Sequence, residues 1–288
     1  MNSSEIDFIK KEIQKTGFQL EDRVASIFSE LKNCEVEQNY YFTDWQTGDF
    51  RELDLKITYK VTSPPINIEY IFLVECKHLP GHAWVFVRSR GDQLVFKNVM
   101  STWDNVGKDG RQEPVVEILK PIFKVNGLVC DTYSHRSKEI ILDKKKSNKR
   151  DDNILSSSIK LAKVLHFEQK KNRKFDEILR ESIKREFDKI KIYYPLIVFE
   201  GKMFEAAMFP DLDVKPISSA HLNHFSIQNR EEIEMIIDIV KVGDLRDFIQ
   251  ERFLMEANQV KEKEAEVRDS YISLIRKLRM SSKHLEVP

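Results

Sequence analysis

The sequence predicts an α/β protein in which helices flank a mixed central sheet. Residues 21–31 carry apolar side chains at helical spacing, whereas residues 50–59 and 69–77 have the patterns of two successive strands. Helix-like and strand-like segments then follow one another through the second half of the chain. We therefore expect an α/β core followed by an α/β extension.

The first helix that bears on function spans residues 21–31. Its expected buried stripe, at spacing i, i+3, i+4 and i+7, consists of Val24, Ile27, Phe28 and Leu31. Glu21 lies one turn before Val24 on the same stripe, where an acid must face a partner. One interpretation is a carboxylate at a helix start, favoured by the macrodipole. We favour an acid directed at a site in the strands that follow, because those strands supply a target.

The two strands are expected to form an antiparallel hairpin. Alternating apolar residues make 50–59 a half-buried strand, and the unbroken apolar run at 70–74 is typical of a central strand covered on both faces. Two prolines, which cannot donate ladder hydrogen bonds, lie between them in a turn. A hairpin folded symmetrically about these prolines places Asp54 opposite Glu75, and Glu52 opposite Lys77.

Such a hairpin gathers charged side chains on one face. Opposed Cβ atoms lie about 4.5–5.5 Å apart, and two carboxylates that close repel each other unless a cation lies between them. Lys77 shares the face of Glu75, since side chains along a strand alternate with period two. There are two simpler interpretations: these residues face solvent, or Glu75 and Lys77 form an ordinary ion pair. Neither explains why Asp54 would also lie beside Glu75, a charged residue at the end of an apolar run, where an unpaired charge is costly. Paired carboxylates beside an ammonium suit phosphodiester hydrolysis with a hard divalent cation.

The motif has a known counterpart. A helix bearing Glu21, then Arg51-Glu52-Leu53-Asp54, then Val74-Glu75-Cys76-Lys77 resembles the PD-(D/E)XK nuclease superfamily and is similar to the Mrr-type restriction endonucleases. The resemblance covers about residues 15–100, and Leu53 stands where the family pattern has Pro. It implies a restriction-endonuclease-like core and Mg²⁺ as cofactor, with Mn²⁺ as a substitute.

The same resemblance implies a role for each site residue. Asp54 and Glu75 would be metal ligands, together with the backbone carbonyl of Cys76. Lys77 would position or activate the nucleophilic water, and Glu21 would support the metal directly or through water. Glu52 is a second acid that could share this role.

We expect a metal-dependent nuclease, with DNA as the favoured substrate and bacterial restriction or anti-phage defence as its role. An RNA nuclease is an alternative, because the chemistry takes place at the phosphate. A catalytically silent nucleic-acid-binding or assembly protein on the same fold is another. The intact set of Asp54, Glu75 and Lys77 argues against a catalytically silent protein.

Composition is consistent with a cytoplasmic enzyme. The 288 residues include 41% hydrophobic residues, and 47 basic residues balance 47 acidic ones. The N-terminus lacks the pattern of a signal peptide, and no apolar stretch approaches the roughly 18 residues of a membrane span. The three cysteines have no metal-site spacing and suit a reducing compartment.

A zero net charge means that nucleic-acid binding would need a local basic patch. Arg88 and Arg90, just past the motif, are the favoured contacts, and double-stranded DNA is the expected partner. A lysine run offers a second patch, for which a solvated loop is the better interpretation. The run consists of Lys144, Lys145 and Lys146. The sequence is compatible with two kinds of protein partner, a second copy of the chain and other proteins of a defence system.

The basic stretch near residue 145 is the candidate domain boundary. Residues 1–145 would form the nuclease core, and residues 146–288 a helical and α/β extension that either continues the core or stands apart. The elements expected there are helices at 154–169 and 175–189, strands at 192–199, 203–208 and 233–240 with a turn at Gly201, and a helix from Leu245.

Overall fold

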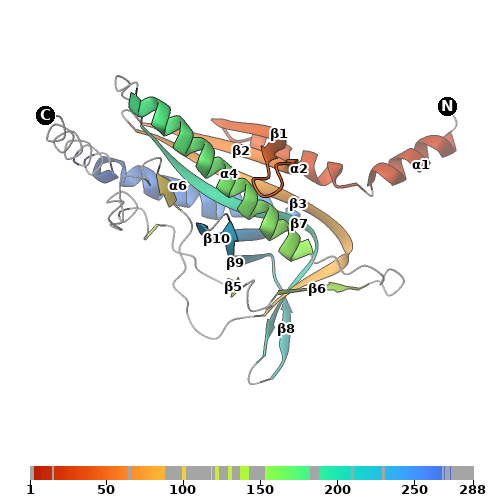
Figure 1. Ribbon diagram of the computed structural model, residues 1–288. Helices are drawn as coiled ribbons and strands as arrows, with labels where there is room; N and C mark the ends of the chain where they lie inside the picture. The colour runs from red at the N-terminus through yellow and green to blue at the C-terminus, as the bar shows by residue number, and fades with distance from the viewer. Residues whose placement is uncertain are drawn as a thin grey trace, which may run out of the picture.

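A computed structural model gives the arrangement of these elements (Figure 1). It describes residues 3–14, 16–63, 66–87, 99–101, 118, 121–122, 129–131, 137–142, 153–181, 188–208, 211–228, 231–267, 269 and 273. Across these ranges the chain forms a ten-stranded sheet with helices on both faces. The prediction of an α/β protein with a mixed sheet flanked by helices is confirmed.

The sheet combines antiparallel and parallel pairs in the order β1-β2-β3-β7-β10-β9-β5. Its main strands are β1 (Cys34–Thr43), β2 (Phe50–Ser63), β3 (Ile66–Val87), β7 (Asp188–Ala207), β10 (Glu231–Lys241), β9 (Ser219–Gln228) and β5 (Val129–Asp131). Shorter strands pair with this path at β3 or β7, and they are β4 (Val99–Ser101), β6 (Ser137–Ile141) and β8 (Asp213–Pro216). Because β3 pairs in parallel with β7, residues on either side of position 145 belong to one sheet.

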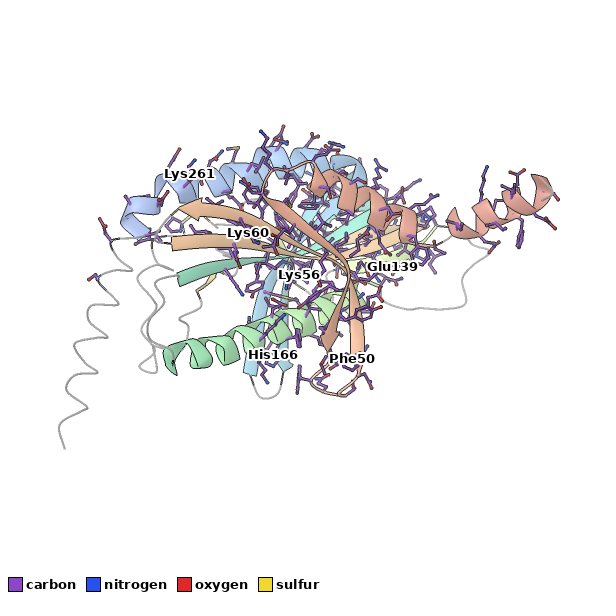
Figure 2. All side chains as sticks on the ribbon, turned by 90° about the horizontal axis from the view of Figure 1, so that it is seen from above. Phe50, Lys56, Lys60, Glu139, His166 and Lys261 are labelled. Atoms are coloured by element: carbon purple, nitrogen blue, oxygen red, sulfur yellow. The ribbon has the colours of Figure 1, made fainter. Side chains whose placement is uncertain are left out.

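Helices cover the two faces differently, as Figure 2 shows from above. On one face lies α4 (Asn153–Glu181). The other face carries α2 (Phe18–Ser29) and a helical run of η2 (Val242–Asp244), α5 (Leu245–Asp247), η3 (Phe248–Phe253) and α6 (Leu254–Glu262). The N-terminal α1 (Ser3–Gln14) projects from the body (Figure 1).

The central strand β3 separates two hydrophobic cores. Phe72 and Val74 belong to the core under α2 and α6, whereas Ile71 and Leu73 belong to the core under α4. Each of these four side chains is at most 2% exposed. The unbroken apolar run therefore serves both faces, as predicted for a covered central strand.

The predicted hairpin is confirmed, and its register is confirmed as far as the pair of Leu55 and Val74. The ladder of the described residues ends there, so it does not include the expected pairs of Asp54 with Glu75 and of Glu52 with Lys77. β2 pairs antiparallel with β3 from Ser63 opposite Ile66 to Leu55 opposite Val74, which is the symmetry about the prolines that the sequence predicted. The predicted stripe of α2 is also confirmed, since Val24, Ile27 and Phe28 are buried and Leu31 packs partly buried against the same core.

Two predictions for the second half are wrong. A single helix, α4, takes the place of the first expected helix and continues through residues 175–181 of the second, because the polar residues 170–174 contain no Gly or Pro to end it, whereas residues 188–189 belong to β7. β7 also runs straight through Gly201, where a turn was expected. There a Cβ atom would clash with the ring of Phe199 and lie 3.0 Å from the carbonyl oxygen of Leu79. Gly201 therefore permits a close approach of β3 rather than a turn.

Among the helices of the described residues, none is long and apolar enough to cross a membrane.

Candidate active site

The candidate site lies where the ladder between β2 and β3 ends. Leu55 and Val74 form the last pair of that ladder, and Asp54 is the next residue of β2. The Oδ2 atom of Asp54 accepts a hydrogen bond of 2.6 Å from the backbone N–H of Cys76. The side chain of Asp54 is thereby fixed against β3, close to Glu75.

Glu75 brings a buried carboxylate to the same place. Its side chain is 3% exposed and lies on the α4 side of β3. Lys77, two residues along the strand, places its Nζ atom 2.7 Å from Oε1 of Glu75. The sequence-predicted trio of Asp54, Glu75 and Lys77 is therefore brought together.

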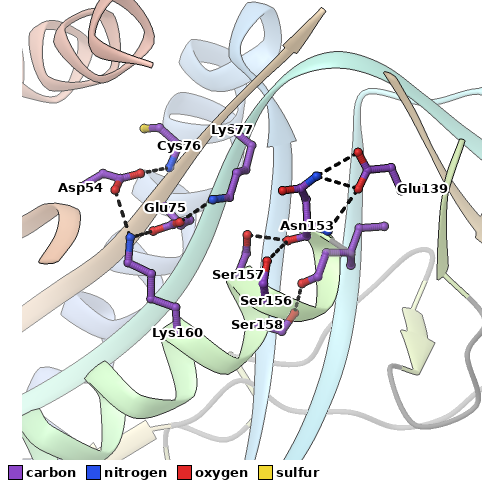
Figure 3. A network of polar contacts seen from close by, with 11 residues as sticks. Asp54, Glu75, Cys76, Lys77, Glu139, Asn153, Ser156, Ser157, Ser158 and Lys160 are labelled. Carbon is purple, nitrogen blue, oxygen red and sulfur yellow. Dashed lines mark hydrogen bonds and ion pairs between the residues drawn. The ribbon is translucent and has the colours of Figure 1, made fainter. Parts of the chain in front are cut away.

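A further residue, Lys160 of α4, completes the site (Figure 3). Its Nζ atom lies 2.5 Å from Oε2 of Glu75 and 3.2 Å from Oδ1 of Asp54. The two carboxylates thus share one cation, the ammonium of Lys160, which offsets the repulsion between them. Sequence reasoning missed Lys160 because it lies 106 residues from Asp54 and reaches the site only through the packing of α4 on the sheet.

Burial and charge act in opposite directions on these groups. Burial, followed by the nearby Asp54 carboxylate, raises the pKa of Glu75, while Lys160 and Lys77 oppose the rise. Burial acts to lower the pKa of Lys160, but the Glu75 and Asp54 carboxylates outweigh it and hold this pKa above its usual value. The two carboxylates therefore favour a cation beside them, and the ammonium of Lys160 takes that place.

Glu21 responds to the same charges from the neighbouring helix. It lies in the first turn of α2, and its pKa is raised from 4.5 to about 7 by burial and then by repulsion from Asp54 and Glu52. A carboxylate stabilised only by a helix N-terminus would have a lowered pKa. Burial and the charges of the site acids together outweigh the helix N-terminus, and the influence of Asp54 and Glu52 supports the interpretation that Glu21 is directed at the site.

Beyond the site, other polar pairs tie α4 to β1, to β2 and to the segment between these strands. Lys163 places its Nζ atom 2.7 Å from Oδ2 of the buried Asp44. Glu168 forms an ion pair of 3.0 Å with Lys56 and accepts a short hydrogen bond from the Tyr40 hydroxyl. These contacts position the helix, and with it Lys160, over Asp54 and Glu75.

The start of α4 is held from a different strand. Asn153, its first residue, donates from its backbone N–H and its side-chain amide to the carboxylate of Glu139 on β6 (Figure 3). A carboxylate there satisfies free N–H groups of the helix end and suits the macrodipole. Asn153 therefore anchors α4 before Lys160, and Lys163 and Glu168 anchor it after Lys160.

The oxygen donors are suited to Mg²⁺, which binds through one or two carboxylates and keeps several waters. Asp54 and Glu75 each direct one oxygen at the same cation position. Within the described residues, no cluster of three or more His, Cys, Asp or Glu side chains is arranged to hold a metal. The chain thus offers a two-carboxylate site with Glu21 nearby, rather than a closed cage.

The remaining predicted residues are placed as follows. Cys76 has its side chain in the core under α2, while the metal-binding role of its carbonyl stays a prediction. Glu52 is exposed and hydrogen-bonded by Tyr41. The predicted nucleic-acid contacts lie outside the described residues, and they are Arg88, Arg90, Lys144, Lys145 and Lys146.

Comparison of the chain with protein-family models, curated proteins and solved structures gives no match. The functional interpretation therefore depends on the motif and on the geometry of the site.

Proposed function

We propose that this protein is a metal-dependent nuclease that hydrolyses phosphodiester bonds in double-stranded DNA, on a restriction-endonuclease-like core. The observation that carries the proposal is the convergence of Asp54 and Glu75 on one cation position, with the Lys77 ammonium 2.7 Å from Glu75. A structural ion pair would need one carboxylate and one ammonium. Two acids and two lysines gathered at the end of a hairpin ladder are more than packing requires.

Asp54 and Glu75 would hold the cofactor, Mg²⁺ or Mn²⁺, which supplies Lewis-acid polarisation of the phosphate and a more acidic water. Lys77 is 24% exposed, so its ammonium can reach a substrate at the surface while Glu75 orients it. There it would position the attacking water and stabilise the charge that builds on the phosphate oxygens. Glu21 would receive a hydrogen bond or a proton from a water at the edge of the site, since its pKa of about 7 allows both protonation states near neutral pH.

The biological setting follows from the resemblance to Mrr-type enzymes alone. A cytoplasmic role in bacterial restriction or anti-phage defence, with itself or other defence proteins as partners, is proposed on that basis. An RNA nuclease would use the same phosphate chemistry, and a silent binding protein would use the same fold.

The test is incubation of the purified protein with supercoiled plasmid, linear DNA and RNA, each in Mg²⁺, in Mn²⁺ and in EDTA. We expect cleavage of DNA in either metal and none in EDTA. Cleavage of RNA alone would reassign the substrate. Cleavage undiminished by EDTA would refute the metal mechanism, and binding without cleavage in any metal would favour the silent alternative.

A further inference from the structure

We propose that Lys160 is a built-in counter-ion that competes with the metal for the site, so that this side chain sets the metal affinity of the protein. The inference rests on the proposed function, because it concerns the same two carboxylates. It assigns to α4 a control over the site that the motif on β2 and β3 does not contain.

The first support is the use of the carboxylate oxygens. Oδ2 of Asp54 accepts the N–H of Cys76, and Oε1 of Glu75 contacts Lys77. The other two oxygens, Oδ1 of Asp54 and Oε2 of Glu75, are those that contact Nζ of Lys160. A metal ion held by both acids at this position would compete with the Lys160 ammonium for these two oxygens. The ammonium and the metal therefore exclude each other from this position.

The second support is the balance of charge. The carboxylates of Asp54 and Glu75 are matched by the ammonium groups of Lys77 and Lys160, so the metal-free cluster of these four side chains has no net charge. A divalent ion added to this cluster would face two ammonium groups at close range. Release of one ammonium from the acids lowers that repulsion.

The third support is that Lys160 can withdraw without moving its helix. Its side chain is 26% exposed, and a lysine has a flexible four-carbon stem. The contacts of Lys163 with Asp44 and of Glu168 with Lys56 hold α4 independently of Lys160. Displacement therefore breaks one set of ion pairs and leaves the packing of the helix in place.

The experiment measures Mn²⁺ binding by isothermal titration calorimetry in the absence of nucleic acid. The variants are Lys160→Met and Lys160→Gln, which remove the competing charge, and Lys160→Arg, which keeps it. Lys163→Met is the matched control, because it removes a lysine of the same helix that pairs with a different acid, Asp44. The full-length chain is used throughout.

We expect Lys160→Met and Lys160→Gln to bind Mn²⁺ about tenfold to a hundredfold more tightly than the wild type, which is the range expected for removal of a competing charge-assisted contact. Lys160→Arg and Lys163→Met should bind as the wild type does. In EDTA both Met variants should melt at a lower temperature than the wild type, because each removes an ammonium group from a buried carboxylate. Mn²⁺ should restore the melting temperature of Lys160→Met and not that of Lys163→Met.

Equal or weaker Mn²⁺ binding by both Lys160→Met and Lys160→Gln would overturn the inference. If the wild type binds Mn²⁺ and cleaves DNA in that case, the proposed function stands and only the competition is refuted. If neither the wild type nor these variants bind Mn²⁺ at millimolar concentration, the proposed function fails and the inference fails with it.

Discussion

Replacing Glu21 with Gln should make the metal-free protein more stable than the wild type at alkaline pH. The pKa of Glu21 is raised to about 7 in the folded protein, against an ordinary value of 4.5. The folded chain therefore keeps a proton on Glu21 after the unfolded chain has lost it. The free energy of unfolding falls as the pH rises from 4.5 to about 7, and the loss is complete above that range. Glutamine cannot ionise, so the variant avoids the loss.

The size of the effect follows from the two pKa values. At 1.36 kcal/mol for each pH unit, the difference between 4.5 and about 7 corresponds to about 3 kcal/mol. Glu21 is partly exposed, and solvent screening reduces this figure, so we expect about 1–2 kcal/mol. The favourable effect of a helix N-terminus on an acid, about 0.3–1 kcal/mol, has the opposite sign and is smaller. Burial and repulsion within the site should therefore decide the outcome.

The assay is denaturant unfolding in EDTA near pH 5 and near pH 8.5. Glu21→Gln should gain stability over the wild type at the higher pH and much less at the lower pH. Glu251→Gln, which alters an exposed acid of η3, should show no such dependence. An equal effect of Glu21→Gln at both pH values, or a more stable wild type near pH 8.5, would refute the claim that burial and the site acids raise the pKa of Glu21.

Three other outcomes are expected. Lys77→Ala should abolish turnover and retain Mn²⁺ binding, because Lys77 contacts a ligand rather than the cation position; cleavage at the wild-type rate would refute its role. Replacing the lysines at positions 144–146 with glutamate should reduce the salt dependence of DNA binding if these lysines contact phosphates. Each phosphate contact contributes about −0.9 to the slope of log K against log salt concentration, and an unchanged slope would assign the lysines to solvent. Gly201→Ala should cost about 1–3 kcal/mol in unfolding free energy through its clash with Phe199, whereas Gly243→Ala, in open space, should not; equal stabilities would contradict this explanation.

The hairpin could be predicted from sequence because its determinants are local. Two prolines mark the turn, and the side-chain period of two then fixes which residues face each other along the rest of the ladder. The buried stripe of α2 could be predicted for the same reason, since helical spacing is a property of neighbouring residues.

Features that depend on distant packing could not be predicted. Lys160 has no distinguishing neighbour in sequence, and its partners become visible only when α4 lies on the sheet. β1 was not predicted either, because it lies at the end of the sheet and several consecutive residues in it are exposed, which weakens the alternation. The close approach at Gly201 likewise depends on the Leu79 backbone of a strand far away in sequence.

The most direct test of the central claim is a comparison of two matched variants, Asp54→Asn and Asp44→Asn, in plasmid cleavage with Mg²⁺. Each variant neutralises an acid that binds a lysine of α4, Lys160 in the first case and Lys163 in the second. Circular dichroism spectra first establish that both variants are folded at the assay temperature. We expect Asp54→Asn to abolish cleavage, because it removes the negative charge of a proposed metal ligand, and Asp44→Asn to cleave at nearly the wild-type rate. Equal cleavage by the two variants would contradict the assignment of Asp54 to the metal site.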